Sequence, residues 1–106
     1  MSAERLLKLL EMLEESPRDS FLLFATAKEY ENLDDPDQAL DYFHLLLDSD
    51  PAYVGLYYHL GKLLEKLDRT AEAADIYRKG MEVANAQKDR HSYNELSGAL
   101  LNLGME

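Results

Sequence analysis

The sequence predicts an all-α protein built from pairs of antiparallel helices that repeat along the chain. Residues of similar character recur 34 positions apart, as Ala39 and Ala73 do. Apolar residues follow helical spacing through most of the chain, and no stretch alternates apolar and polar residues as a strand would. A period of this length is typical of one helix pair that stacks on its neighbours. The same spacing relates Phe43 to Tyr77, Ala27 to Gly61, Tyr30 to Leu64 and Pro17 to Pro51.

The first helix is expected over residues 3–15, within a half-repeat over 2–16, with Ser2 as its N-cap. Its leucines recur at helical spacing and share one face. Pro17 disfavours helical backbone at the residue before it, so the helix should end there. Because Pro17 stands one period before Pro51, this segment corresponds to the second helix of an incomplete repeat. In that alignment Leu9 matches Phe43 and Met12 matches Leu46.

Two complete repeats are expected next, over residues 20–53 and 54–87. Each contains two runs of helical spacing separated by a short turn and is bounded by a break in the pattern. Both repeats should therefore fold as helix hairpins. The individual helices are expected near residues 20–33, 36–49, 53–67 and 70–86.

The turns within the two repeats carry residues suited to ending and starting helices. Asp34 and Asp68 occupy matching positions, and aspartate tolerates the left-handed backbone conformation that such turns use. Pro36 suits the first turn of the helix that follows. Thr70 is expected to cap the corresponding helix of the second repeat.

The pattern returns two positions late near the C-terminus, where Tyr93 and Leu100 follow Tyr57 and Leu64 by 36 residues. This shift predicts a final helix over about 90–103, ended by Gly104. The chain should then form one domain of about six antiparallel helices. Its parts are an N-terminal half-repeat or capping helix, two whole repeats and a C-terminal capping helix. Their expected ranges are 2–16, 20–53, 54–87 and 88–104, within a single domain over 1–106.

Composition excludes several classes of function. A chain of 106 residues with 46% apolar residues has the size and composition of one folded domain. Its formal net charge of −10 argues against binding to nucleic acid or to anionic membranes, since both require clustered Lys and Arg. The absence of cysteine excludes disulfides and thiolate metal sites. With no long apolar run and an acidic N-terminal segment, the protein is expected to be soluble and cytoplasmic.

Acidic residues are concentrated in the first repeat. Residues 19–52 contain nine acids and one base, whereas residues 53–86 contain five of each. The first repeat should therefore be strongly negative and the second nearly neutral. The acids expected on its outer and edge surfaces include Glu29, Asp37, Asp41 and Asp48.

No arrangement of residues predicts catalysis. His44, His59 and His91 are isolated from one another, without the spacing of a metal-binding pair. The serines lack the context of a nucleophile elbow, and the five glycines form no phosphate-binding loop. The sequence therefore predicts a protein that is not an enzyme and needs no cofactor or metal.

The order of small and large residues in each period resembles the tetratricopeptide repeat (TPR) family. That resemblance covers nearly the whole chain and implies a fragment of a right-handed α-solenoid. The departures are modest, with Leu23 or Tyr57 at the tryptophan position and Asn85 at the closing proline. The matching residues are Leu23, Thr26, Ala27, Tyr30, Ala39, Phe43, Leu46 and Pro51 in the first repeat, and Tyr57, Leu60, Gly61, Leu64, Ala73, Tyr77 and Gly80 in the second.

In TPR proteins the first helix of each pair lines a concave groove that holds peptide segments. The resemblance implies that this groove is lined here by aromatic, lysine and glutamate ladders. An aromatic ring beside a lysine can hold a peptide by apolar contact and by pairing with its carboxylates. The candidate groove residues are Phe24, Lys28, Glu31, Tyr58, Lys62, Glu65 and Asn94, within a wider wall that also includes Phe21, Asn32, Gly55, Lys66, His91, Gly98, Leu101 and Asn102.

A structural alternative stays open for these residues. Lys28 and Lys62 could pair with Glu31 and Glu65 on their own helices and only neutralise them. Phe24 and Tyr58 could likewise be packing residues. The carboxylate clamp of chaperone-binding TPR domains is absent, so an EEVD-type chaperone tail is not expected as the ligand. The clamp positions hold Phe24, Lys28, His59, His91 and Glu95.

Two functions follow from this interpretation. The first is an interaction module that binds a protein or peptide, with an acidic segment favoured by the lysines. The second is a self-assembling or scaffold protein, because leucines make the final helix apolar on more than one side. A homodimer would then form through Leu96, Leu100 and Leu103, with Leu101 beside them.

Overall fold

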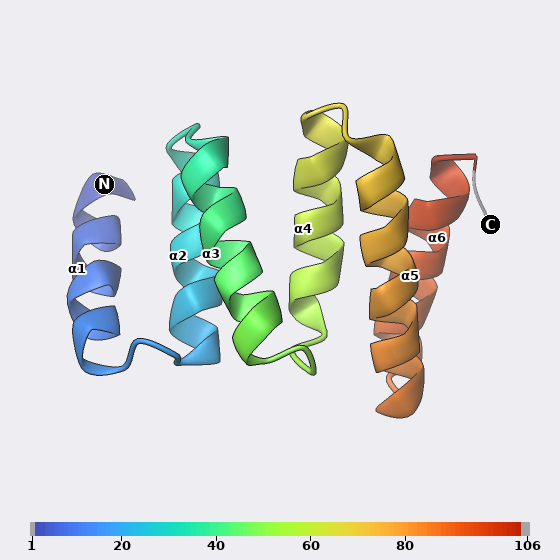
Figure 1. Cartoon of the computed structure of the whole chain (residues 1–106), viewed down its shortest axis with the longest axis horizontal. Helices are drawn as coiled ribbons and strands as arrows, with labels where there is room; N and C mark the ends of the chain where they lie inside the picture. Colours follow the sequence, from blue (N-terminus) through green and yellow to red (C-terminus); the bar gives the residue numbers. More distant parts are fainter. Residues whose placement is uncertain (1, 105–106) are drawn as a thin grey trace. The chain divides into compact units, whose positions relative to one another are not determined.

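The computed structural model describes residues 2–104 and confirms the all-α fold, since every regular element within that range is an α-helix (Figure 1). The chain divides into two compact units, Met1–Tyr53 and Val54–Glu106. Three consecutive helices belong to each unit. The first unit contains α1 (Ser2–Glu15), α2 (Ser20–Asn32) and α3 (Pro36–Ser49), and the second contains α4 (Gly55–Lys66), α5 (Thr70–Ala86) and α6 (Arg90–Asn102).

Aspartate side chains cap the starts of α2, α3 and α6, whereas α4 and α5 begin without a capping side-chain bond. Asp19, Asp35 and Asp89 each accept a hydrogen bond from a backbone N–H in the first turn of α2, α3 and α6. The prediction of Thr70 as a cap is wrong, because α5 already begins at Thr70 and Arg69 precedes it without a capping side-chain bond. The predicted cap Ser2 has a side chain that lies outside the described part.

The turns inside the two repeats have the predicted left-handed backbone. Asp34 and Asp68 both have φ of 59°. A third residue, Lys88, adopts the same φ in the turn between α5 and α6. Lysine is not favoured in this conformation, so the sequence carried no signal for it.

Small residues in the first unit allow α2 and α3 to pack closely. Ala27 and Ala39 are fully buried, as predicted for Ala39, and the ring of Phe43 is buried with them. Phe24 lies at the edge of this core, where its ring centroid is 6.2 Å from that of Phe43 and 5.5 Å from that of Tyr53.

The second unit uses two glycines where its helices approach most closely. A β-carbon on Gly61 would lie 2.1 Å from Tyr77 Cε1. A β-carbon on Gly80 would lie 2.5 Å from the Tyr57 Cβ and 2.8 Å from Leu96 Cδ1. Gly80 therefore lets α5 contact α4 and α6 at once. Ala73, predicted to be buried at the α4–α5 crossing, has 0% exposure.

A buried carboxylate joins α1 to the rest of the first unit. Glu29 on α2 is 6% exposed and forms an ion pair with Arg5 on α1, whose Nε atom lies 2.8 Å from Glu29 Oε1. Its Oε2 atom and the Thr26 hydroxyl are buried without a partner among the described residues. The expectation that Glu29 lies on the outer surface is therefore wrong, because α1 covers that part of α2.

None of the helices in the described range is long and apolar enough to cross a membrane.

Candidate functional site

A shallow hollow on the second unit brings together predicted groove residues from two helices. Tyr58 and Lys62 come from α4, and Asn94, Gly98 and Asn102 come from α6. Glu95 and Ala99 complete the lining of this hollow, whose volume is about 210 Å³. Residues 36 positions apart in the sequence thus share one surface, because α6 packs beside α4 in the same unit.

A second hollow of about 210 Å³ adjoins the first and shares Tyr58 and Glu95 with it. Together they form a continuous surface, the α4–α6 face. The second hollow contains Gly55 of the predicted wall and adds Val54, His59, Ser92 and Leu96, which the sequence did not indicate as groove residues. Its lining is Val54, Gly55, Tyr58, His59, Ser92, Glu95 and Leu96.

Lys62 is held in place by groups of its own unit. Its Nζ atom lies 3.6 Å from Glu65 Oε2 and 5.6 Å from the centroid of the Tyr58 ring. Glu65 also accepts a hydrogen bond from the buried Tyr77 hydroxyl on α5. The pairing of Lys62 with Glu65 is thus present, and it also orients the lysine along the α4–α6 face. Lys62 remains partly exposed, so its ammonium can still reach a ligand carboxylate.

Burial and the hydrogen bond to Glu65 both raise the pKa of the Tyr77 phenol well above its ordinary value. Above pH 10 the unfolded chain would lose this proton while the folded protein retains it. The free energy of unfolding should then fall by about 1.4 kcal/mol per pH unit from this group alone. Tyr77→Phe should have a smaller alkaline loss of stability in urea unfolding. Parallel pH profiles for the two proteins would contradict this assignment.

The candidate residues of the first repeat lie on α2 in the first unit. Lys28 Nζ is 3.3 Å from Glu31 Oε1, so this repeat also contains the alternative lysine–glutamate pair. Phe24 is half-buried against Phe43 and Tyr53 rather than fully exposed. Its alignment with Tyr58 in one ladder stays a prediction.

The wider predicted wall is only partly assembled. His91 is exposed and lies 3.7 Å from Glu95 Oε1, and neither it nor Leu101 lines a hollow of the α4–α6 face. Gly98 faces open space, since a β-carbon there would meet no atom within 4 Å. A β-carbon at this position therefore meets no neighbouring side chain or helix.

The leucines proposed for a homodimer are mostly unavailable. Leu96 is 1% exposed and Leu100 is 4% exposed, because both pack into the core of the second unit. Leu103 is partly exposed, and Leu101 is 61% exposed. The prediction that Leu96 and Leu100 form an open apolar edge is therefore wrong. The sequence showed that Leu96 and Leu100 are apolar residues of the final helix. It could not show that α5 already covers them.

Within residues 2–104, no group of three or more histidine, aspartate or glutamate side chains is arranged to hold a metal ion.

A model of the tetratricopeptide repeat family matches residues 54–87. A crystal structure of a tetratricopeptide repeat domain protein from Salinibacter ruber is 45% identical, with a TM-score of 0.77 over 83% of this chain and 99% of that one. A solution structure of such a protein from the same organism is also 45% identical, with a TM-score of 0.80 over 85% and 92%.

A solution structure of a Bordetella parapertussis protein is 28% identical, with a TM-score of 0.80 over 93% of this chain and 86% of that one. No curated protein matches significantly. The match to the Salinibacter protein spans almost all of its length at high identity, and the helix pairs described above carry the small and large residues of the repeat. The chain belongs to the tetratricopeptide repeat family.

Proposed function

We propose that this protein is a non-enzymatic interaction module that binds a peptide segment of a partner on the α4–α6 face. Tetratricopeptide repeats act generally as protein–protein interaction modules, which supports the general function. The observation that carries the specific proposal is the hollow in which Tyr58, Lys62 and Asn94 converge. An aromatic ring, a cation and an amide there offer three different kinds of contact.

The lining suits a peptide backbone. Asn94 and Asn102 are exposed, and each amide can donate to a peptide carbonyl and accept from a peptide N–H. Gly98 lies between them on α6 and leaves room for the backbone to approach. The Tyr58 ring adds an apolar surface at the boundary of the two hollows.

The charges favour a peptide that carries a carboxylate near Lys62. This lysine is 3.6 Å from Glu65, and Glu65 is additionally held by Tyr77, so a ligand carboxylate can share the ammonium. Glu95 on the opposite side would repel a second ligand carboxylate. We therefore propose an acidic segment with its carboxylates toward α4. Phe24, Lys28 and Glu31 on α2 are proposed as peptide contacts of the first unit taken by itself.

Gly98→Leu should block peptide binding without unfolding the protein. Its side chain would project into the hollow, where no atom lies within 4 Å of the β-carbon position. Peptides selected from a random library on the wild-type protein should bind this variant at least about tenfold more weakly, as loss of a central contact commonly produces. Fluorescence anisotropy with the labelled peptides would measure the change.

Ala71→Leu is the matched control, because it adds the same side chain at an exposed position of α5 that lines none of these hollows. It should bind the peptides as the wild type does. Backbone amide shifts on peptide addition should concentrate at Tyr58, Asn94 and Asn102. Peptides that bind Gly98→Leu unchanged, or that shift amides elsewhere, would refute the assignment.

A further inference from the structure

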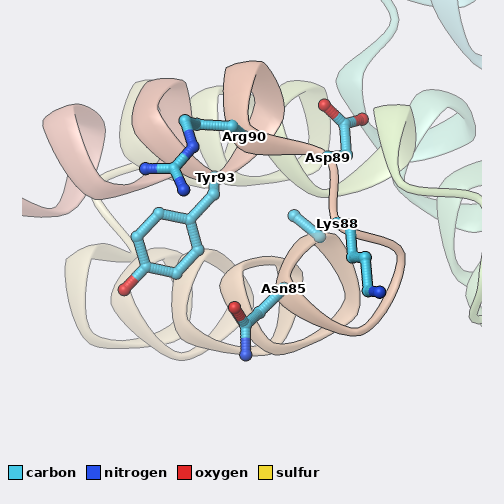
Figure 2. A pocket seen from close by; sticks show the side chains of 6 residues that line it. Asn85, Lys88, Asp89, Arg90 and Tyr93 are labelled. Atoms are coloured by element: carbon cyan, nitrogen blue, oxygen red, sulfur yellow. The ribbon is translucent and has the colours of Figure 1, made fainter.

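The second unit has another groove, separate from the α4–α6 face, between α5 and α6. Two hollows of about 480 Å³ and about 350 Å³ adjoin there and share Asn85 and Tyr93. Figure 2 shows Tyr93 extending from α6 toward α5, with Arg90 beside it. We call this groove the α5–α6 seat. Its other lining residues include Arg78, Met81, Glu82, Lys88, Asp89 and Leu100.

The α5–α6 seat has a basic end in a protein whose net charge is −10. Lys88 and Arg90 form no ion pair with any residue in 2–104. The Asp89 carboxylate between them accepts hydrogen bonds from the Ser92 backbone N–H at 3.1 Å and from the Ser92 hydroxyl at 2.7 Å. In Figure 2 it points away from Tyr93. The two cations are therefore available to an acidic partner.

Internal repetition indicates what kind of partner fits the α5–α6 seat. Tyr57 on α4 is 2% exposed because α5 packs against it at Gly80. Tyr93 stands at the corresponding position of α6, 36 residues later, yet it is 37% exposed. No helix among residues 2–104 covers it as α5 covers Tyr57. The α5–α6 seat therefore matches a helix of the same type as α3 and α5.

The chain itself supplies a helix of this type in α1. Met12 corresponds by the 34-residue period to Leu46, which is 0% exposed in α3, whereas Met12 is 48% exposed. Leu7 on the same helix is 63% exposed. Met12 on α1 and Tyr93 on α6 are thus exposed, whereas Leu46 and Tyr57, which occupy the equivalent positions, are buried.

The charges of α1 match those of the α5–α6 seat when the two helices run antiparallel, as neighbouring helices of one repeat do. In that orientation the C-terminal end of α1 lies beside the N-terminal end of α6. The end of α1 carries the exposed Glu11, Glu14 and Glu15. The start of α6 carries Lys88 and Arg90. Since each copy is strongly acidic, contact between copies is favoured where this basic surface meets carboxylates.

We propose that α1 of a second copy docks into the α5–α6 seat, so that copies associate head to tail. The contact uses different surfaces on the two copies, unlike a twofold dimer, and leaves one seat and one α1 free in each pair. It therefore permits growth beyond a dimer. This interface is independent of peptide binding on the α4–α6 face.

Two charge-reversal variants of the full chain test the proposal. The first, Lys88→Glu with Arg90→Glu, removes the basic end of the seat. The second, Glu14→Lys with Glu15→Lys, removes the acidic end of α1. Circular dichroism should show that both remain folded, because all four side chains are exposed. In sedimentation velocity the wild type should gain mass as its concentration rises, and each variant alone should stay monomeric.

Mixing the two variants tests whether the end of α1 and the basic end of the seat meet directly. The intact α1 of one variant fits the intact seat of the other, and the two reversed surfaces also carry opposite charges. An equimolar mixture should therefore regain the association that each variant alone has lost, with a mass that rises beyond that of a pair, as a symmetric dimer would not. Lys66→Glu with Lys79→Glu makes the same charge change outside the seat and should associate as the wild type does. A wild type that stays monomeric at every concentration, or a mixture that stays monomeric, would overturn the proposal.

Discussion

Replacing Gly80 with alanine should destabilise the protein by roughly 1–3 kcal/mol, the usual range for overpacking a close-packed contact. The added β-carbon would lie 2.5 Å from the Cβ of Tyr57 and 2.8 Å from Leu96 Cδ1. The Tyr57 Cβ is attached directly to the α4 backbone, so it cannot move aside without moving the helix. Accommodating one methyl group therefore requires α5 to separate from α4. Urea unfolding followed by circular dichroism would measure the loss.

Gly61→Ala should also destabilise the protein, because its β-carbon would lie 2.1 Å from the Tyr77 ring. That ring is fully buried and its hydroxyl is bonded to Glu65, so it has little freedom to rotate away. Gly98→Ala is the matched control. With no atom within 4 Å, this methyl group should raise the free energy of unfolding by about 0.5–1 kcal/mol through helix propensity. Equal stability of all three variants would contradict the packing described here.

Arg5→Ala should destabilise the first unit on the order of 1–3 kcal/mol, because it leaves the buried Glu29 carboxylate without its cation. Arg5 Nε is 2.8 Å from Glu29 Oε1, and the two side chains are 63% and 8% exposed. Without Arg5 the buried glutamate would lose most of the compensation of its charge, whereas without Glu29 the exposed arginine would be solvated by water. Amide hydrogen exchange should show the greatest loss of protection in α1.

Replacing the other member of the ion pair tests whether the two side chains contribute unequally to stability. Glu29→Leu leaves Arg5 solvated and fills the site with an apolar side chain, so it should cost little stability or add some. The double variant Arg5→Ala with Glu29→Leu should be more stable than Arg5→Ala alone. If Arg5→Ala proved no less stable than the wild type, the ion pair would contribute nothing to holding α1.

The sequence could predict which positions line the candidate site, but not how their side chains are arranged and held. The resemblance to the TPR family implied Tyr58, Lys62 and Asn94 as groove positions, and the structure brings them to one hollow. The period could not indicate how Lys62 is held, because Tyr77 restrains Glu65 from another helix. His59 was missed for a related reason, since an isolated histidine has no distinguishing signal until a neighbouring helix makes it part of a surface.

The repeating order of small and large residues by itself determined the helix pairs and their turns. A 34-residue period identifies which side chains occupy equivalent places, as the matched left-handed turns at Asp34 and Asp68 show. Only the tertiary structure decided which apolar or charged side chains are covered. Glu29 is buried beneath α1, and Leu100 is buried while Leu101 is exposed. Periodicity defines the face of a helix, but burial depends on which neighbouring helix occupies that face.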